Sequence, residues 1–169
     1  MNRAIDLDFT GSNFRKDEWP NYKFVLSNMS ESVFENLFDF RESLNSAVYP
    51  SPLEEAHVRD RNSDSRHDIR GGQRLSDATD VFVERRLAKK AYSILLATPS
   101  IRGLGIYRHS VFNGETDKFT MFHIDTRPQN YVSLWVADRE TSEDNFEYTS
   151  YQADFRGYFR VLTKSGFFD

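Results

Sequence analysis

The chain has 169 residues, of which 38% are hydrophobic and 15% aromatic, so one domain with a substantial hydrophobic core is expected. Its formal net charge of −4 argues against a general nucleic-acid-binding protein, because such proteins need basic surface to displace counterions. The absence of cysteine excludes disulfides, thiolate metal ligands and a cysteine nucleophile. Any metal ion would therefore have to bind histidine and carboxylate side chains.

The sequence carries no recognisable sorting or membrane signal. Residues 1–14 lack an apolar run behind a basic start, so no signal peptide is predicted. No stretch approaches the ~20 apolar residues that a membrane-spanning helix needs, so no membrane span is expected. A target outside the cytoplasm would require that something else deliver the protein.

The first half of the chain predicts one clear helix and one long loop. Residues 1–28 are irregular and are expected to wrap the domain or to meet a partner. Behind Ser30, a typical N-cap residue, apolar side chains recur every three or four positions and predict an amphipathic helix over 31–44. A short strand is expected at 47–49. The polar stretch 51–76 predicts a loop, and a loop of this length in a compact domain is usually functional.

The second half predicts one helix and several strands. Residues 80–83 predict a short buried strand or the entry to a helix, and residues 83–97 predict a second amphipathic helix. Three further strands are expected at 103–107, 119–127 and 131–136. The tail after residue 137 is rich in Phe and Tyr, and its secondary structure is left open.

Polar side chains gather on one face of the strand predicted at 119–127. Because side chains alternate along a strand with a period of two, His123, Asp125 and Arg127 share one face. Phe122 lies on the opposite face, which suits the core. From this segment alone, an ion pair on a surface strand is the simpler interpretation.

Two residues elsewhere in the sequence could join His123 in a metal site. His67 lies in the polar loop, and Asp80 lies at the edge of an apolar run. An acid that enters a core needs a partner, because its uncompensated burial is costly, and a metal ion would be one. Two histidines and one carboxylate from separate elements, with one position open to water, are a common catalytic zinc arrangement.

These segments together resemble the M15 family of zinc peptidases, which includes D-Ala-D-Ala carboxypeptidases and phage endolysins. The first block of the resemblance consists of Ser65-Arg66-His67, Gly71-Gly72 and Ala78-Thr79-Asp80-Val81. The second block consists of Gly103-Leu104-Gly105-Ile106-Tyr107, His123-Ile124-Asp125-Thr126-Arg127 and Trp135. The likeness covers about residues 33–136 and is closest to small members encoded by bacteriophages.

The resemblance implies an α+β fold of the Hedgehog/DD-peptidase-like type, with a small antiparallel sheet and flanking helices. It implies an M15-like metallopeptidase domain at 29–137. Residues 1–28 would then be an N-terminal arm. Residues 138–169 would be an aromatic C-terminal extension, packed on the domain or on a partner.

The resemblance assigns Zn2+ to His67, Asp80 and His123. The interval between the first two is longer than in the compact form of the motif, so Asp77 is a rival ligand. The implied function is hydrolysis of a D,D or L,D peptide bond in bacterial peptidoglycan. The protein would be an endolysin or a virion-associated enzyme, located in the host cytoplasm or in the virion and acting on the cell wall.

The remaining catalytic roles are less uniquely assigned. Arg59 matches the arginine that holds a substrate carboxylate or carbonyl oxygen, with Arg61 as the alternative, because a planar guanidinium suits bidentate binding. Thr120 occupies the position of the usual acidic base and cannot serve. Asp125 is expected either to act as the base or to orient His123. Two other candidate bases lie in the preceding loop, at Glu115 and Asp117.

Four further residues are expected to have no direct role in chemistry. His57 and His109 are predicted to be ordinary, solvated loop histidines, and Tyr107 and Trp135 to be packing residues. The alternative function is that of a structural virion or assembly protein that keeps the fold without the activity. Its partners would be other virion proteins, bound through the two terminal segments.

Overall fold

The computed structural model describes residues 2–10, 13–107, 110–115, 118–138, 147–164 and 167. The described strands are β1 (Tyr49–Pro50), β2 (Ala78–Glu84), β3 (Gly103–Tyr107), β4 (Phe119–Asp125), β5 (Ser133–Asp138) and β6 (Glu147–Ser150). The described α-helices are α1 (Tyr22–Asn28), α2 (Glu31–Leu44), α3 (Ala88–Ala97) and α4 (Phe155–Lys164). Short 3-10 helices lie at Ala4–Asp6, Lys16–Glu18, Glu54–Ala56 and Arg85–Leu87.

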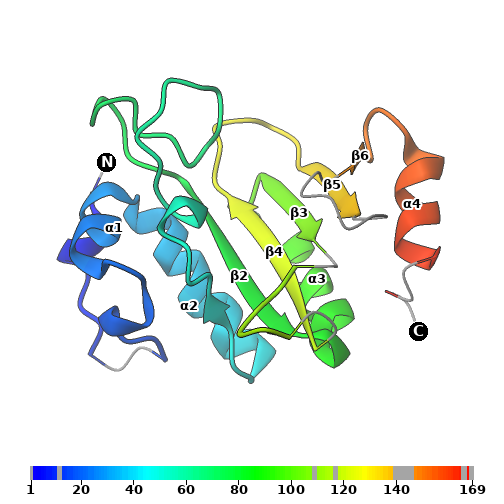
Figure 1. The fold of residues 1–169 in the computed structure, drawn as a ribbon, viewed down its shortest axis with the longest axis horizontal. Coiled ribbons are helices and arrows are strands. Elements are labelled where there is room, and N and C mark those ends of the chain that lie inside the picture. The colour runs from blue at the N-terminus through cyan, green and yellow to red at the C-terminus, as the bar shows by residue number, and fades with distance from the viewer. Residues whose placement is uncertain are drawn as a thin grey trace.

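The strands form one six-stranded sheet in the order β1-β2-β4-β3-β5-β6. Helices α2 and α3 cover one face of this sheet, and α4 stands at the β5–β6 end (Figure 1). Neighbouring strands are antiparallel except β3 and β5, which run parallel. The protein is therefore a mixed α/β structure, which is compatible with the predicted α+β class, but the sheet that was predicted to be antiparallel contains one parallel pair.

Several predicted elements have the expected bounds. The helix predicted at 31–44 is α2, and the strand predicted at 103–107 is β3. Residues 80–83, for which both a strand and the entry to a helix were predicted, form a strand, because β2 runs from Ala78 to Glu84. For the same reason the helix predicted at 83–97 begins only at Ala88, after the strand and a 3-10 turn.

One face of the sheet supplies the hydrophobic core. Val81 pairs with Phe122, Phe122 with Ile106, and Ile106 with Val136. These four side chains are almost completely buried and belong to one cluster with the apolar sides of α2 and α3. The alternation predicted for 119–127 is confirmed, because Phe122 points into this core while its strand neighbours point to the other face.

The opposite face of the sheet carries a row of polar and aromatic positions. Asp80 of β2 pairs with His123 of β4, His123 with Gly105 of β3, and Gly105 with Trp135 of β5. Paired residues on one face lie close enough for their side chains to interact. The register of four adjacent strands thus gathers chemistry-bearing residues that are far apart in the sequence.

The two terminal segments contribute to the same core as the sheet. Phe14 and Trp19 are buried against Phe34 of α2, and Tyr158 and Leu162 of α4 are buried at the other end of the molecule. Phe167, near the end of the chain, packs against Tyr92 of α3 and is buried. The division of the chain at residues 28 and 137 stays a prediction. No helix within the described ranges has the length and apolarity needed to cross a membrane.

Candidate metal centre

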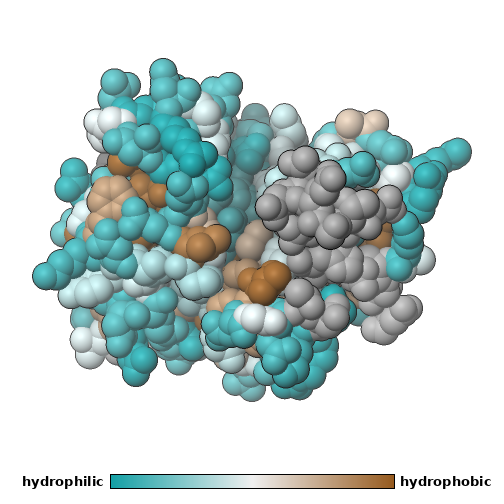
Figure 2. Space-filling view, in the orientation of Figure 1, coloured by the Kyte–Doolittle hydropathy of each residue, from teal (hydrophilic) through white to brown (hydrophobic). Residues whose placement is uncertain are grey.

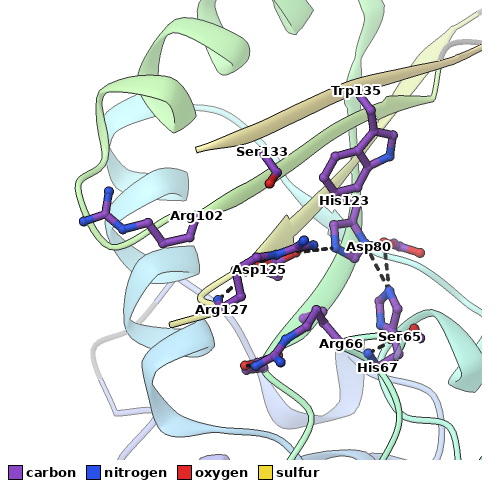
Figure 3. A network of polar contacts seen from close by, with 12 residues as sticks. Ser65, Arg66, His67, Asp80, Arg102, His123, Asp125, Arg127, Ser133 and Trp135 are labelled. Carbon is purple, nitrogen blue, oxygen red and sulfur yellow. Dashed lines mark hydrogen bonds and ion pairs between the residues drawn. The ribbon is translucent and has the colours of Figure 1, made fainter. Parts of the chain in front are cut away.

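Three side chains from separate elements converge on the outer face of the sheet (Figure 3). His67 comes from the loop before β2, Asp80 from β2 and His123 from β4. Nε2 of His67 lies 3.1 Å from Nδ1 of His123 and 3.6 Å from Oδ1 of Asp80. Nδ1 of His123 lies 2.9 Å from the same oxygen. All three residues are buried, and together they could hold a metal ion. His67, Asp80 and His123 are called the metal group below.

The spacing of the three ligand atoms fits a zinc ion. Two ligand atoms that each lie ~2.1 Å from zinc at a tetrahedral angle are ~3.4 Å apart. The three separations observed, from 2.9 to 3.6 Å, bracket this value. Two imidazole nitrogens and one carboxylate oxygen are also a donor set that zinc accepts.

His123 is oriented through its second ring nitrogen. Its Nε2 atom lies 3.1 Å from Oδ2 of Asp125, and Arg127 donates from Nε to Oδ1 of that carboxylate at 2.7 Å. Burial opposes the ionisation of Asp125, but hydrogen bonds from Arg127 and His123 hold its pKa well below the ordinary value. Since an ionised carboxylate only accepts hydrogen bonds, Nε2 carries a proton and Nδ1 faces Asp80. A carboxylate behind the ring is typical of metal-binding histidines.

The charges of the group favour a cation at its centre. Burial lowers the pKa of His67 to about 3, so this imidazole is neutral. Burial opposes a charge on His123, yet its hydrogen bonds to Asp125 and Asp80 raise its pKa to about 9. Burial also opposes ionisation of Asp80, but the two histidines hold its pKa below the ordinary value. A proton on Nδ1 of His123 suits this arrangement, and a divalent ion would replace that proton.

Backbone hydrogen bonds hold the loop that carries His67 in place. The amide of Arg59 donates to the carbonyl of His67 at 2.9 Å, and the amide of Ile69 donates back to the carbonyl of Arg59 at 2.8 Å. The side chain of Ile69 is buried in the core, which anchors the loop from below. Nδ1 of His67 meets no hydrogen-bond partner among the described residues, so this ring is oriented by packing and backbone alone.

The rival ligand Asp77 lies outside the group. Nε of Arg66 donates to its Oδ1 at 2.7 Å, and the guanidinium also contacts its second oxygen. Asp77 is buried in this ion pair. It does not line the pocket into which the metal group opens. Asp80, not Asp77, is therefore the carboxylate that the fold brings to His67 and His123.

The two candidate substrate arginines have different positions. Arg59 lines the pocket around the metal group, and its Nε donates to the carbonyl of Glu55 at 2.7 Å. Arg61 is exposed and forms an ion pair with the side chain of Glu55 at 2.9 Å. Of these two candidates, Arg59 is thus the one whose guanidinium can meet a ligand in the pocket.

None of the described candidate bases named from the sequence lines the metal pocket. Asp125 is fully buried and engaged by His123 and Arg127, as described above. Glu115 is exposed and paired with Lys118 at 2.8 Å, and Asp117 lies outside the described residues. Thr120 is buried on the core side of β4, so even an acid there would face away from the pocket.

The metal group opens into a pocket of about 400 Å³. Tyr107 and Trp135, predicted to be packing residues, line this pocket. The Trp135 ring centre lies 5.0 Å from that of His123, and its Nε1 lies 3.4 Å from the hydroxyl of Tyr107. Burial raises the pKa of Tyr107, so its phenol stays protonated and can donate a hydrogen bond.

Asp64 is a pocket residue that the sequence did not single out. It lines the pocket, its side chain is exposed, and it forms an ion pair with Arg70 at 3.0 Å. Apart from Asp80 of the metal group, it is the acid among the described residues that line this pocket. Its position in a polar, charged loop gives no signal that distinguishes it from a solvated acid.

His57 is not the solvated loop histidine that was predicted. It is fully buried, with Nε2 donating to the carbonyl of Ser51 at 2.8 Å and Nδ1 lying 2.7 Å from the hydroxyl of Thr79. Because the carbonyl can only accept, Nδ1 accepts from Thr79. His57 therefore ties the segment after β1 to β2 beside the metal group. His109 lies outside the described residues.

Comparison with known protein families, with curated proteins and with solved structures finds no match. The geometry of the metal group and the residues around it are therefore the basis for a functional proposal.

Proposed function

We propose that this chain is a zinc-dependent peptidase that hydrolyses peptide bonds in bacterial peptidoglycan. The observation that carries the proposal is the convergence of His67, Asp80 and His123 on one pocket. These are the residues that the resemblance to M15 peptidases assigns to zinc. We further propose a Hedgehog/DD-peptidase-like fold and a bacteriophage origin, with action on the cell wall from the host cytoplasm or from the virion.

Zinc is the metal that the donor set supports best. Two neutral imidazoles and one carboxylate leave a coordination position for water or substrate, as in catalytic rather than structural zinc sites. Zinc held there would polarise an amide carbonyl and lower the pKa of a water molecule to ~7, which amide hydrolysis requires.

Asp125 would be a positioning residue rather than the general base. Its carboxylate is held by Arg127 and by Nε2 of His123, and it does not line the pocket. Its pKa is also far below the range that suits a base near neutral pH. It would fix the ring of His123 so that Nδ1 stays directed at the metal.

Asp64 would take the proton of an attacking water, because apart from Asp80 it is the acid among the described residues that line the pocket, and Arg70 pairs with it there. It lines the pocket and is exposed, so a water molecule can reach it. A general base typically contributes 10²–10⁴-fold to turnover. Arg59 would bind a carboxylate or carbonyl oxygen of the substrate.

The alternative is a structural virion or assembly protein that keeps the fold without activity. One observation favours it: the bases expected from the sequence are engaged elsewhere or absent from the pocket wall among the described residues. Release of peptides from isolated cell walls would distinguish the peptidase from the structural protein.

The test is incubation of the zinc-loaded chain with isolated peptidoglycan, with and without a chelator, followed by mass spectrometry of the released peptides. We expect chelator-sensitive products whose new termini identify a D,D or L,D bond. Asp64→Asn should keep its zinc and release products ~10²-fold or more slowly. A folded, zinc-loaded protein that releases nothing from several wall types would favour the structural alternative.

A further inference from the structure

A second pocket adjoins the metal pocket on the same face of the sheet. It has a volume of about 380 Å³ and shares Arg59 and Asp80 with the first pocket. Its floor includes Phe82 and Met121, which are cross-strand partners on β2 and β4. Its walls come from the segment after β1 and from residues 110–111, after β3. A ligand at the metal can thus extend directly into this second pocket.

The second pocket is lined mainly by apolar side chains. Leu53 and Val111 stand at its walls and are 67% and 48% exposed, although both are hydrophobic. Figure 2 shows hydrophobic surface gathered in the middle of this face, beside a hollow. Exposed apolar side chains around a concave site are typical of ligand-binding surfaces rather than of solvated ones.

One buried polar group in this pocket lacks a partner. The hydroxyl of Ser110 is buried, lines the pocket and meets no hydrogen-bond partner among the described residues. Buried hydroxyls are nearly always hydrogen-bonded, because leaving one unpaired is costly. A hydroxyl can donate and accept, so a polar group of a ligand seated among the apolar walls would satisfy it.

We infer that the second pocket is a subsite that binds a long aliphatic side chain of a peptide ligand whose backbone crosses the metal pocket. The inference rests on the proposed function, because it places a peptide at the metal. Arg59 borders both pockets and would hold the ligand backbone between them. The pocket is far larger than a methyl group needs, so an unbranched four-carbon chain should bind better than alanine or glycine.

The test uses the methyl group of Met121 as a reporter of the pocket. The chain has three methionines, and Met29 is fully buried in the core, where it serves as an internal control. The full-length chain with ¹³C-methyl methionine is titrated with N-acetyl-norleucine amide and with N-acetyl-glycine amide. We expect the norleucine compound to shift the Met121 signal at a concentration about tenfold lower or less, with Met29 unchanged. Equal behaviour of the two compounds would overturn the inference.

Matched surface variants check the location. Leu53→Asp and Val111→Asp should weaken binding of the norleucine compound about tenfold, because they put a charge into an apolar wall. Leu96→Asp changes another exposed leucine, on α3, and should leave binding unaltered. Equal losses in Leu53→Asp and Leu96→Asp would refute the location.

This experiment separates the inference from the proposed function. Side-chain-dependent shifts of Met121 without release of wall peptides would support the pocket and reject the peptidase. Release of wall peptides without any preference for the norleucine compound would support the peptidase and reject the pocket.

Discussion

Asp77, just before β2, and Asp80, within β2, have opposite environments. Asp77 is neutralised by Arg66, whereas Asp80 faces the imidazoles of His67 and His123. Asp80→Asn should therefore cost the chain most of its zinc affinity, beyond the roughly 10–100-fold loss typical of an orienting residue. The isosteric variant Asp77→Asn should keep one zinc per chain, because it breaks only the pair with Arg66.

Zinc affinity is measured by competition with a chromophoric chelator, after circular dichroism has established that both variants are folded. Equal losses in Asp77→Asn and Asp80→Asn would contradict the assignment of the carboxylate ligand. Retention of tight binding by Asp80→Asn would show that the two histidines bind zinc with another acid.

His57 makes stability depend on pH through its burial. Burial lowers its pKa below the ~6.5 of an unfolded histidine, although the Ser51 carbonyl and Asp80 partly oppose this. Below about pH 6.5 the unfolded chain takes up a proton that the folded chain refuses. The contribution of His57 to stability is thus complete above that pH and falls on acidification by up to ~1.4 kcal/mol per pH unit.

The variant His57→Gln should flatten the acid side of the stability curve. The free energy of unfolding, measured in urea at several pH values below 7, should fall less steeply for the variant than for the wild type. Parallel curves would mean that His57 titrates alike in the folded and unfolded chain.

The sequence pointed to the candidate metal group because each of its three residues has a local signal. His123 lies on an alternating strand, Asp80 edges an apolar run, and His67 belongs to a recognisable block. The sequence left two roles open for Asp125, that of the base and that of the residue that orients His123, and its contacts with His123 and Arg127 favour the second. The burial of His57 was not accessible from the sequence, because the fold and not the chain order brings its partner Thr79 near.

At the scale of elements, the glycine at position 105 of β3 leaves room for the side chain of Trp135. A Cβ atom on Gly105 would overlap the indole of Trp135, which lies across this strand against His123. Gly105→Ala should therefore displace Trp135 and destabilise the fold by about 1–3 kcal/mol, as overpacking commonly does. Urea unfolding of the single variants and of the double variant with Trp135→Ala measures the coupling.

The double variant decides whether the indole is the cause. If the clash with Trp135 explains the loss, Gly105→Ala should cost little in a chain that already carries Trp135→Ala. An undiminished loss in that background would point instead to the backbone of β3.

Local patterns predicted the elements whose signals are local. The apolar period of α2 and the glycine-containing run of β3 predicted their bounds, whereas α3 begins later than predicted because the run after Asp80 continues as a strand. The parallel pairing of β3 with β5 is a long-range choice that no segment encodes alone. In the aromatic tail, apolar residues at 155, 158, 159 and 162 recur at helical spacing and could have indicated α4, whereas the four residues of β6 show no clear alternation.

At the scale of the whole molecule, the terminal segments bear on the choice between enzyme and assembly protein. A detachable arm would offer its aromatic side chains to a partner. In the described structure, Trp19 is only 3% exposed, with its ring centre 4.7 Å from that of Phe34 and 5.1 Å from that of Phe14. The aromatic residues near the N-terminus are thus committed to the core of the same chain.

The burial of Trp19 predicts a large effect of one substitution on the stability of the chain. Trp19→Ala should lower the free energy of unfolding by about 3–5 kcal/mol, because it removes a buried ring and leaves a cavity. Tyr131→Ala, at a side chain that is 61% exposed, is the matched control and should change stability by less than ~0.5 kcal/mol. Urea unfolding followed by circular dichroism measures both. Near-wild-type stability of Trp19→Ala would mean that the N-terminal segment detaches in solution, which would strengthen the case for an assembly protein whose arm binds a partner.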